Sequence, residues 1–333
     1  MKTLLITGIS GFVGGHVVHF FKNHPHEYEI HGISRSNISW DYFSGSFPLA
    51  ETVTFHRADL LDRTRIAAII DAVQPDCILH LAAQSSVGES WNTPASSFTN
   101  NVTGFLNIVE PVRLSGRATK IVSVGSAEQY GVVDKRSLPL REDAIQHPVN
   151  PYGAARVAQE YLANIYAEGY GLDICSTRSF NHCGPGQTDR FVASAIAKQF
   201  ARISLGKQDP VIEIGDSTIV RDFLDVRDVV RAYVLLLEKG VRGQVYNICS
   251  GRGYAISELV TLLSNRMQIP VRIHQSPMKR RPQDNPQIVG SYDKIRAELG
   301  WYPYISLADS LLEMYAYWEN QLSQEKGMNG RVE

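Results

Sequence analysis

A tyrosine and an arginine stand four positions apart, at Tyr152 and Arg156, in a segment with the composition of a helix. Residues four apart in a helix lie on one face, so the two side chains can meet. A nearby cation favours the phenolate form of a tyrosine, which helps that tyrosine to exchange a proton with a bound substrate. The pair therefore predicts acid–base chemistry, in which Tyr152 moves the proton and Arg156 supplies the charge.

A serine and a glutamate lie before this pair, at Ser126 and Glu128, directly after the apolar run 120–123. If that run is a strand of a parallel sheet, both side chains stand at the edge where such sheets bind ligands. The Ser126 hydroxyl could hold a carbonyl oxygen while Tyr152 donates a proton to it, which is the chemistry of ketone reduction. Glu128 could position a substrate or act as a base in an elimination, but the methyl group of the intervening Ala127 can transfer no proton.

The helix that must carry Tyr152 has signals at both ends. Asn150 is a good N-cap, Pro151 suits the first helical position, and Gly169 should end the helix near residue 168. One apolar stripe on this helix indicates core packing or a subunit interface, and it consists of Tyr161, Leu162, Ile165 and Tyr166.

Glycines recur at a fixed spacing between the apolar run 3–6 and the helical segment that follows it. Glycine lets the backbone turn tightly and approach a pyrophosphate, whose charge is held by the amide groups of the helix amino terminus. A purely structural turn is the other interpretation. The residues predicted to form a dinucleotide site here are Gly8, Gly11, Phe12, Val13 and Gly14.

The second apolar run is followed by Arg35, where an acidic residue would hold the ribose hydroxyls of NAD. An arginine suits the 2′-phosphate of NADP, so we expect NADP(H) to be preferred and NAD(H) to be possible, although Arg35 could also be a solvated loop residue. Asp59 and Leu60, after the third run, are placed to contact the adenine. The segment after the fourth run should also line the cofactor, through Leu81, Ala82 and Ala83.

Strands and helices alternate along the first half of the chain. Strands are predicted over 3–6, 29–33, 52–55, 77–81, 120–123 and 172–177. This alternation predicts an α/β fold, with a Rossmann-type doubly wound parallel sheet covered by helices on both faces. After residue 180 short strands (211–214, 244–248) and a helix (256–267) indicate a smaller α/β substrate-binding lobe. We therefore expect a cofactor domain over 1–180, with elements around 222–250 returning to it, and a mainly substrate-binding lobe over 181–325. The polar tail from Gln321 is expected to fray.

The composition of the chain argues against several classes of binding partner. Against 33 lysines and arginines stand 34 aspartates and glutamates, so the formal net charge of −1 argues against nucleic acid and acidic membrane surfaces. No apolar run approaches the ~18 residues of a membrane span. The ten histidines show no metal-ligand spacing, and the four cysteines form neither a disulfide nor a metal pattern. We expect a soluble, cytoplasmic protein without a metal ion.

Several of these motifs together resemble the extended short-chain dehydrogenase/reductase family. They are the glycine spacing, the run HLAA from His80, Ser126 with Tyr130-Gly131, and Tyr152 with its helix. The likeness covers nearly the whole chain. It departs at Arg156, where the family has a lysine. The resemblance implies that the first domain binds NAD(P) and that the protein is a homodimer.

Within that family, the second half resembles the branch that acts on GDP-sugars. The likeness rests on the segments 180–187, 191–192 and 220–228. It implies a GDP-sugar substrate, with His182 beside the cofactor. Apart from the resemblance, the side chains of Arg221 and Arg281 could make bidentate hydrogen bonds with a diphosphate. Alternatively, Arg221 and Asp222 could form a local ion pair. The substrate contacts implied by the resemblance are Ser86, Ser126, Glu128, Asn181, Val192, Arg221, Arg281 and Asp284.

The activity implied is NAD(P)H-dependent reduction of the C4 ketone of a GDP-4-keto-6-deoxy-hexose, giving a product such as GDP-D-rhamnose. The catalytic residues would be Ser126, Glu128, Tyr152 and Arg156. Two alternatives stay open: 4,6-dehydration of GDP-mannose, and binding of NADP or nucleotide sugar without turnover. An arginine keeps the lysine's charge but does not readily lose a proton. We therefore expect Arg156→Lys to leave or raise the rate of ketone reduction.

Overall fold

The computed structural model describes residues 1–23, 28–37, 40, 52–279 and 285–329. The strands are β1 (Lys2–Thr7), β2 (Tyr28–Ser34), β3 (Thr54–Arg57), β4 (Cys77–His80), β5 (Lys120–Ser126), β6 (Asp173–Ser179), β7 (Asn181–Cys183), β8 (Val211–Ile214), β9 (Val220–Asp225), β10 (Val245–Ile248), β11 (Gly253–Ala255), β12 (Arg272–Gln275) and β13 (Gln287–Ile288).

The helices are α1 (Phe12–Asn23), α2 (Arg63–Val73), α3 (Val87–Asn92), α4 (Pro94–Phe98), α5 (Gly104–Ser115), α6 (Pro151–Gly169), α7 (Val192–Ser204), α8 (Val226–Lys239), α9 (Ile256–Met267), α10 (Asp293–Leu299) and α11 (Leu307–Asn329). A π-helical turn, η2 (Thr99–Thr103), and three 3₁₀ turns, η3 (Ala127–Gln129), η4 (Lys135–Ser137) and η5 (Pro277–Lys279), lie between them.

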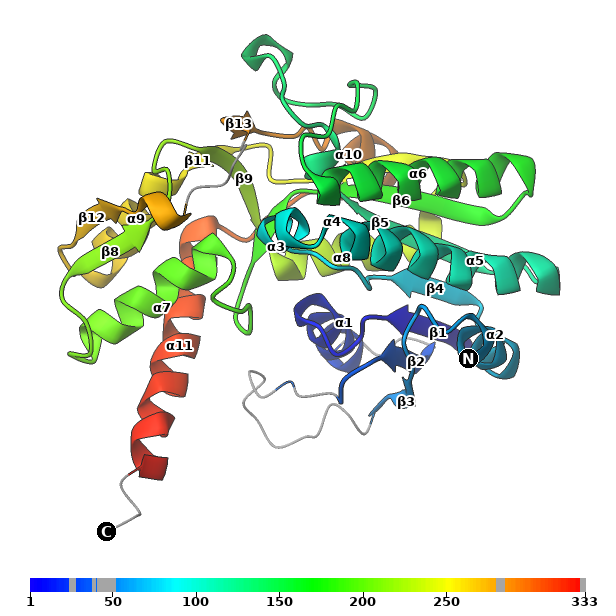
Figure 1. The fold of residues 1–333 in the computed structure, drawn as a ribbon, viewed down its shortest axis with the longest axis horizontal. Helices are drawn as coiled ribbons and strands as arrows, with labels where there is room; N and C mark the ends of the chain where they lie inside the picture. The colour runs from blue at the N-terminus through cyan, green and yellow to red at the C-terminus, as the bar shows by residue number, and fades with distance from the viewer. Residues whose placement is uncertain (24–27, 38–39, 41–51, 280–284, 330–333) are drawn as a thin grey trace.

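The main sheet has seven strands in the order β10-β6-β5-β4-β1-β2-β3, and all neighbouring strands are parallel (Figure 1). The chain winds outward from β1 in both directions, first to β3 and then from β4 to β6, so the sheet is doubly wound. The predicted Rossmann-type α/β fold is therefore confirmed. Each of the six strands predicted up to residue 177 overlaps one strand of this sheet.

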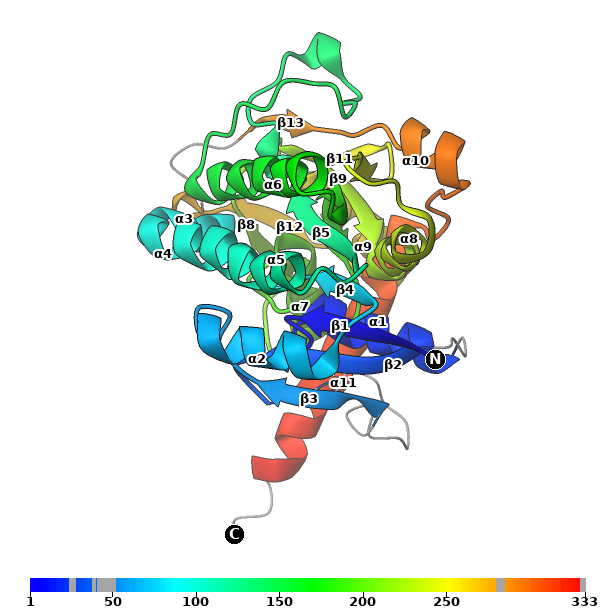
Figure 2. The same ribbon diagram turned by 90° about the vertical axis from the view of Figure 1, so that its right-hand side faces the viewer.

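Helices cover both faces of the main sheet, as Figures 1 and 2 show. On one face, α1 and α8 pack against the sheet in a core that contains Leu4 and Val229. On the other face, α2, α5 and α6 form a second core with Leu5 and Phe105. Successive side chains of a strand point to opposite faces, which is why the adjacent Leu4 and Leu5 belong to different cores.

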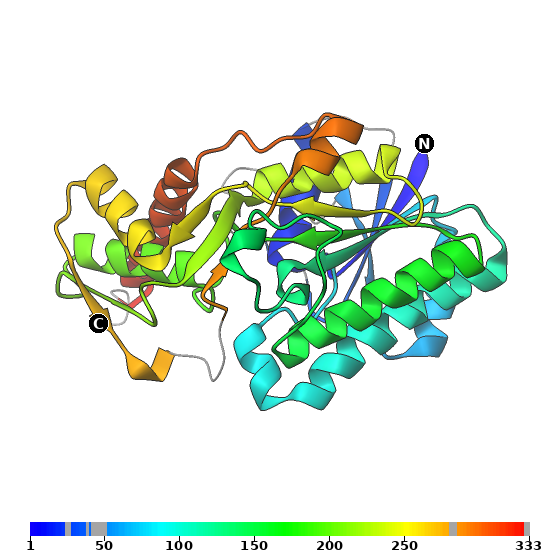
Figure 3. The same ribbon diagram turned by 90° about the horizontal axis from the view of Figure 1, so that it is seen from above.

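A smaller lobe lies to one side of this sheet (Figure 3). It contains a second sheet, in which β9 pairs with β7, β11 and β13, and a two-stranded sheet formed by β8 and β12. Helices α7, α9 and α11 surround a separate core that includes Phe200, Leu259 and Leu311. The strand predicted over 211–214 and the helix predicted over 256–267 coincide with β8 and α9.

The segment 222–250 is shared between the two parts. Its helix α8 covers the main sheet, and β10 extends that sheet by pairing with β6. Strand β9 instead lies in the second sheet. The chain thus crosses from lobe to sheet between Asp225, the last residue of β9, and Val226, the first of α8.

The carboxyl-terminal tail differs from the sequence-based expectation of fraying from Gln321. Helix α11 continues through Asn329. Its Leu322 is buried in the core of the smaller lobe, and the Leu322 carbonyl accepts a hydrogen bond from Lys207 Nζ at 2.6 Å. Packing of an apolar face against a core stabilises a helix, and Leu322 continues the packed face of α11 beyond Gln321. None of the described helices has the length and apolarity needed to cross a bilayer.

Candidate active site

The glycine-rich turn forms a backbone cradle between β1 and α1. Gly8 has φ +71°, and its amide donates to the Ile33 carbonyl at 2.9 Å. A Cβ atom at Gly8 would lie 2.8 Å from Ala82 Cα, and one at Gly14 would lie 2.2 Å from the Ile9 carbonyl oxygen. Side chains are thus excluded where backbone amides and a helix amino terminus converge, an arrangement that suits a dinucleotide pyrophosphate. Phe12 and Val13 begin the helix at this turn.

Arg35 and Asp59 follow β2 and β3 at the same edge of the sheet. Arg35 Nη1 lies 3.9 Å from Asp59 Oδ2, and the side chains are 71% and 44% exposed. This long, exposed ion pair is weak and leaves the guanidinium open to a ligand. Asp59 Oδ1 also accepts from the Leu61 amide at 3.0 Å, while the neighbouring Leu60 contacts the start of α5.

The segment after β4 is fixed to β1 through Thr7. Thr7 Oγ1 lies 3.0 Å from His80 Nδ1 and accepts from the Ala82 amide at 3.2 Å. These contacts place Ala82 and its neighbours, Leu81 and Ala83, against the glycine turn. Burial lowers the pKa of His80 to about 3, with the charge of Arg156 as a second cause. His80 is therefore neutral at physiological pH.

Ser126 ends β5 and is held by a chain of amide and carboxylate contacts. Its amide donates to Gln129 Oε1 at 2.8 Å, and Gln129 Nε2 donates to Glu160 Oε2 at 2.7 Å. Glu160, on α6, also pairs with the buried Arg178 at 2.7 Å. The Ser126 hydroxyl accepts from the Glu128 amide at 3.2 Å and keeps its own proton available for donation.

Glu128 is anchored to the amino end of α6. Asn150 Nδ2 donates to Glu128 Oε2 at 2.8 Å, while Asn150 Oδ1 caps the helix by accepting from the Gly153 amide at 2.8 Å. A Cβ atom at Gly153 would stand 2.6 Å from the Glu128 carbonyl oxygen. The first turn of α6 thus packs directly on η3, which brings Glu128 and Ser126 to the level of Tyr152.

Tyr152 and Arg156 meet as the sequence predicts. Arg156 Nε donates to the Tyr152 hydroxyl at 3.3 Å, and the guanidinium carbon lies 5.3 Å from the centre of the tyrosine ring. Both residues are buried, since Tyr152 is 7% exposed and Arg156 is 3% exposed. Arg156 Nη1 donates to the Val124 carbonyl at 2.9 Å and to Gln159 Oε1 at 2.7 Å. A cation is therefore held against the phenol in a poorly solvated position, where its field is strong.

On the lobe side, His182 and Asn181 lie in the short strand β7 rather than in a loop, because β7 pairs with β9. The His182 ring stacks on Phe12, with ring centres 6.4 Å apart and planes inclined by 7°. Asn181 is exposed, and Val192 begins α7. His182 and Phe12 thereby join the lobe to the glycine turn.

The remaining predicted substrate contacts are spread more widely. Ser86 caps α3 by accepting from the Glu89 amide at 3.2 Å. Arg221 is 4% exposed, and its Nη1 donates to the Asn285 carbonyl at 2.7 Å. Arg281 and Asp284 lie outside the described residues. Asp222 does not rely on Arg221, because it accepts hydrogen bonds from Ser250 and the amides of Gly251 and Gly290.

Three site residues were missed by sequence reasoning. Gln159 accepts a hydrogen bond from Arg156, and Gln129 accepts one from the Ser126 amide. Asn150, which was predicted only as a helix cap, also donates a hydrogen bond to Glu128. Gln159 could have been found, since it stands three residues after Arg156 on the same helix face. The roles of Gln129 and Asn150 depend on contacts between η3 and α6, for which the sequence has no local signal. Among the described residues, no group of three or more metal-ligating side chains gathers.

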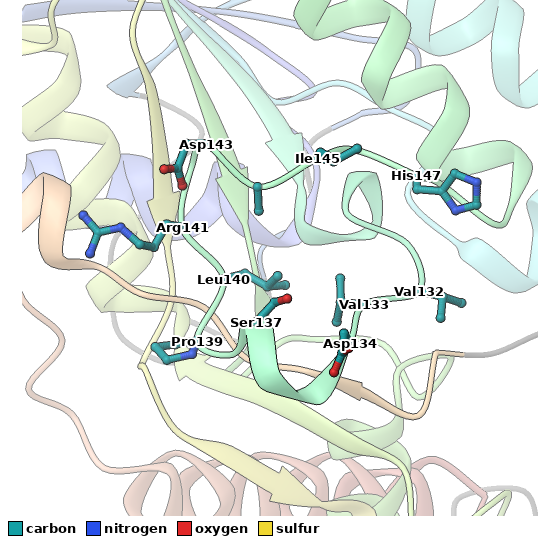
Figure 4. A pocket seen from close by; sticks show the side chains of 11 residues that line it. Val132, Val133, Asp134, Ser137, Pro139, Leu140, Arg141, Asp143, Ile145 and His147 are labelled. Atoms are coloured by element: carbon teal, nitrogen blue, oxygen red, sulfur yellow. The ribbon is translucent and has the colours of Figure 1, made fainter.

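A cavity of about 530 Å³ lies beside the site, within the segment that connects η3 to α6 (Figure 4). Gly131 and His147 pair at the base of this segment. Apolar Val133 and Leu140 and charged Asp134 and Arg141 are among the lining residues. None of the predicted site residues lines the cavity, so it is separate from the site of Tyr152.

The doubly wound sheet, the glycine cradle and the Ser126–Tyr152–Arg156 group define an NAD(P)-dependent enzyme of the extended short-chain dehydrogenase/reductase class. Residues 5–314 match the family model described as GDP-mannose 4,6 dehydratase. The chain belongs to this family, and the resemblance found in the sequence is confirmed.

Relatives in this family have more than one activity. The chain is 34% identical to the GDP-6-deoxy-D-mannose reductase of Pseudomonas aeruginosa, over 97% of this chain and 99% of the relative. It is 26% identical to a GDP-mannose 4,6-dehydratase of Yersinia enterocolitica, over 95% and 93% of the two chains. A solved structure of RMD from Pseudomonas aeruginosa complexed with NADPH matches with a TM-score of 0.83 and 33% identity, covering 96% of this chain and 98% of the other. A UDP-glucose 4-epimerase structure from Thermotoga maritima matches with a TM-score of 0.84 and 29% identity, covering 96% and 99%.

Proposed function

We propose that this protein reduces the C4 ketone of a GDP-4-keto-6-deoxy-hexose with NADPH and forms a GDP-6-deoxy-hexose such as GDP-D-rhamnose. The observation that carries the proposal is the buried Tyr152 hydroxyl, which lies 3.3 Å from Arg156 Nε. This group, with Ser126 at the adjacent strand end, provides what carbonyl reduction needs from a protein. The 34% identity to a GDP-6-deoxy-D-mannose reductase over nearly the full chain supports the same activity.

The protein's own residues would bind and protonate the carbonyl oxygen. NADPH, when bound, would supply the hydride that the carbonyl carbon receives. Ser126 donates a hydrogen bond to the oxygen, and Tyr152 transfers its hydroxyl proton to that oxygen as negative charge develops there. Arg156 stabilises the resulting phenolate, because its guanidinium contacts the hydroxyl and carries a full charge.

For the cofactor, we propose the glycine turn as the pyrophosphate site, with residues 1–180 as the cofactor domain. Arg35 would bind the 2′-phosphate of NADP(H), because its guanidinium is exposed and only weakly paired. NAD(H) remains a possible cofactor, since Asp59 lies nearby and could accept from ribose hydroxyls. Asp59 and Leu60 would flank the adenine, and Leu81, Ala82 and Ala83 the rest of the cofactor. His182 would contribute through its stacking on Phe12.

For the substrate, we propose that the lobe over 181–325 binds the GDP portion. Asn181 is exposed in β7, next to the His182 that stacks on Phe12, while Val192 begins α7 and Ser86 caps α3. Arg221 holds the chain at Asn285, directly after the segment that carries Arg281 and Asp284. We propose that Arg221, Arg281 and Asp284 bind the nucleotide.

We also propose a homodimer in the cytoplasm. Tyr161 and Ile165 of α6 are 61% and 55% exposed, and Phe98 of the neighbouring α4 is 47% exposed. Such a group of large apolar side chains on adjacent helices is suited to self-association. The other two residues of the predicted stripe, Leu162 and Tyr166, pack in the core. All four cysteines are free and buried, which fits a reducing compartment.

A 4,6-dehydratase is the second candidate, because a hydrogen bond holds the Glu128 carboxylate in a defined orientation. Asn150 fixes its carboxylate at 2.8 Å, so Glu128 could act as the base that removes the C5 proton. Ala127 stands beside it, buried, and offers no proton to a departing hydroxyl. The reductase therefore remains the preferred function.

The test is turnover by the purified protein. NADPH and GDP-4-keto-6-deoxy-mannose are mixed, NADPH absorbance is followed, and the sugar product is identified by NMR, which also gives the C4 configuration. We expect NADPH loss that depends on the keto sugar and that falls by at least ~100-fold in Tyr152→Phe. Formation of a keto sugar from GDP-mannose and NADP⁺ would favour the dehydratase. Tight NADPH binding without either reaction would favour a regulatory binding protein.

A further inference from the structure

We propose that Gln159 is a positioning residue, which holds the Arg156 guanidinium beside Tyr152. At the position of Arg156, the short-chain dehydrogenase/reductase motif has a lysine. The kinetic part of this inference rests on the function proposed above; its structural part does not. The observation is that Arg156 Nη1 donates both to Gln159 Oε1 at 2.7 Å and to the Val124 carbonyl at 2.9 Å. Two acceptors on one nitrogen fix the plane of the guanidinium.

The orientation of the Gln159 amide follows from its neighbours. A guanidinium has only donors, so the side-chain oxygen of Gln159 must face Arg156. The amide nitrogen then donates to Ser123 Oγ at 2.9 Å and to the Val124 carbonyl at 3.3 Å. Gln159 thus links Arg156 to β5, the strand whose last residue is Ser126.

This link decides where the other side of the guanidinium points. With Nη1 fixed on β5, Nε is the nitrogen that reaches the Tyr152 hydroxyl. Gln159 is 1% exposed, so water cannot replace its oxygen at low cost. Within the described part of the chain no carboxylate pairs with Arg156, so its positive charge beside the phenol is not neutralised.

A lysine has no planar fork and could not use this arrangement. An ammonium group at position 156 would leave Gln159 Oε1 or the Val124 carbonyl without its donor in a buried site. The contacts thus reverse the sequence-based expectation for Arg156→Lys. We expect that variant to reduce kcat about tenfold instead of leaving or raising it.

The kinetic test is a double-mutant cycle with Gln159→Leu and Arg156→Lys, assayed for reduction of GDP-4-keto-6-deoxy-mannose by NADPH. Gln159→Leu should lower kcat about tenfold with little change in KM, since the substituted side chain does not touch substrate. In the Arg156→Lys background, the same substitution should change kcat less than about twofold, because there is no guanidinium left to position. Fully multiplicative effects would overturn the proposal.

A matched control separates the positioning role of Gln159 from a general effect of replacing a buried glutamine. Gln199→Leu is the matched control, because Gln199, on α7 and away from the site, makes comparable amide contacts with the backbone of Glu213 in β8. Gln199→Leu should leave kcat unchanged.

A crystal structure of the Gln159→Leu variant tests the inference without any substrate. We expect Arg156 Nε to lie beyond hydrogen-bond distance of the Tyr152 hydroxyl, whereas Gln199→Leu should keep that contact. A variant structure with the contact intact would overturn the positioning role even if the protein is an active reductase. A lost contact in a protein inactive on keto sugars would retain the inference and reject the proposed function.

Discussion

Tyr152 and Arg156 meet in a nearly dry position, which gives the charge of Arg156 more effect than it would have at the surface. Besides the Tyr152 hydroxyl, Arg156 donates to two neutral acceptors, the Val124 carbonyl and the Gln159 side-chain oxygen. Neutral partners hold the side chains in place without cancelling the charge of Arg156. At the scale of single residues, the site is therefore built to orient a proton donor.

Glu128 is the residue that distinguishes reduction from elimination. We predict that Glu128→Gln leaves NADPH-dependent reduction within about threefold of wild type, because the amide oxygen can still accept from Asn150 Nδ2. Any dehydration of GDP-mannose should be lost, since an amide cannot remove a proton. Both rates are measured on the same preparation, by NADPH absorbance and by NMR of the sugar. A reduction rate lowered more than about a hundredfold would contradict a positioning role.

Helix α6 is the element that assembles the site, because it carries Tyr152, Arg156, Gln159 and Glu160. Its close approach to η3 depends on Gly153, where a Cβ atom would lie 2.6 Å from the Glu128 carbonyl oxygen and 3.1 Å from Pro148 Cβ. The obstructing oxygen belongs to the backbone, so it cannot move aside as a flexible side chain would. The distance between α6 and η3 is thus set by a missing side chain.

We predict that Gly153→Ala separates the helix from η3. The overlap should cost about 1–3 kcal/mol of unfolding free energy and should lower kcat at least ~10-fold by displacing Tyr152 from Ser126. Urea unfolding and steady-state kinetics measure the two effects. Gly169→Ala, in the last turn of the same helix, is the control, because nothing lies within 4 Å of its added Cβ. Equal behaviour of the two variants would show that the close approach is unimportant.

At the scale of the whole molecule, contacts of α1 with β7 and with the segment that follows β7 join the cofactor domain to the smaller lobe. His16 Nε2 lies 2.9 Å from the Pro185 carbonyl oxygen, and Phe12 stacks on His182. Gly184 has no room for a side chain, since its Cβ would lie 2.6 Å from Val226. The smaller lobe is therefore joined to the glycine turn itself, so substrate and cofactor sites are positioned together.

This junction should weaken in acid. Burial lowers the pKa of His16 from 6.5 to about 4, while Pro185 and Asp225 oppose this shift. The folded-state pKa lies below the unfolded value, so the stabilisation is complete above about pH 6.5 and is lost as pH falls towards 4. At about pH 5 the loss from His16 is about 2 kcal/mol, and His80 adds to it in the same direction.

We predict that His16→Gln, which keeps a donor for Pro185, flattens the fall in unfolding free energy between about pH 7.5 and 5. Urea unfolding at several pH values measures the slope. His274→Gln is the control, because His274 is exposed on β12 and should leave the slope unchanged. An unaltered slope in His16→Gln would show that His16 is not responsible.

At the same scale, the exposed apolar side chains of α4 and α6 predict self-association. Ile165→Asp should convert the proposed dimer to a monomer at micromolar concentration, since a carboxylate cannot be buried against Tyr161 and Phe98 without a partner. Sedimentation velocity gives the mass. Val241→Asp changes an equally exposed apolar residue away from these helices and should not alter the mass. A wild-type monomer would exclude the dimer.

The fold class, the glycine turn, the start of α6 and the pairing of Tyr152 with Arg156 are all predictable from the amino-acid sequence. These features follow from local rules, namely periodicity, capping and the spacing of residues along one helix. The groups that surround the pair are visible only in the folded chain. Three contacts illustrate this: Asn150 with Glu128, Gln129 with Ser126, and Gln159 with Arg156 and β5. Core packing brings the elements together, and the polar side chains buried between them must then find hydrogen-bond partners. Arg156 therefore acts from a position that the folded chain builds for a guanidinium, through the Val124 carbonyl and the Gln159 side-chain oxygen.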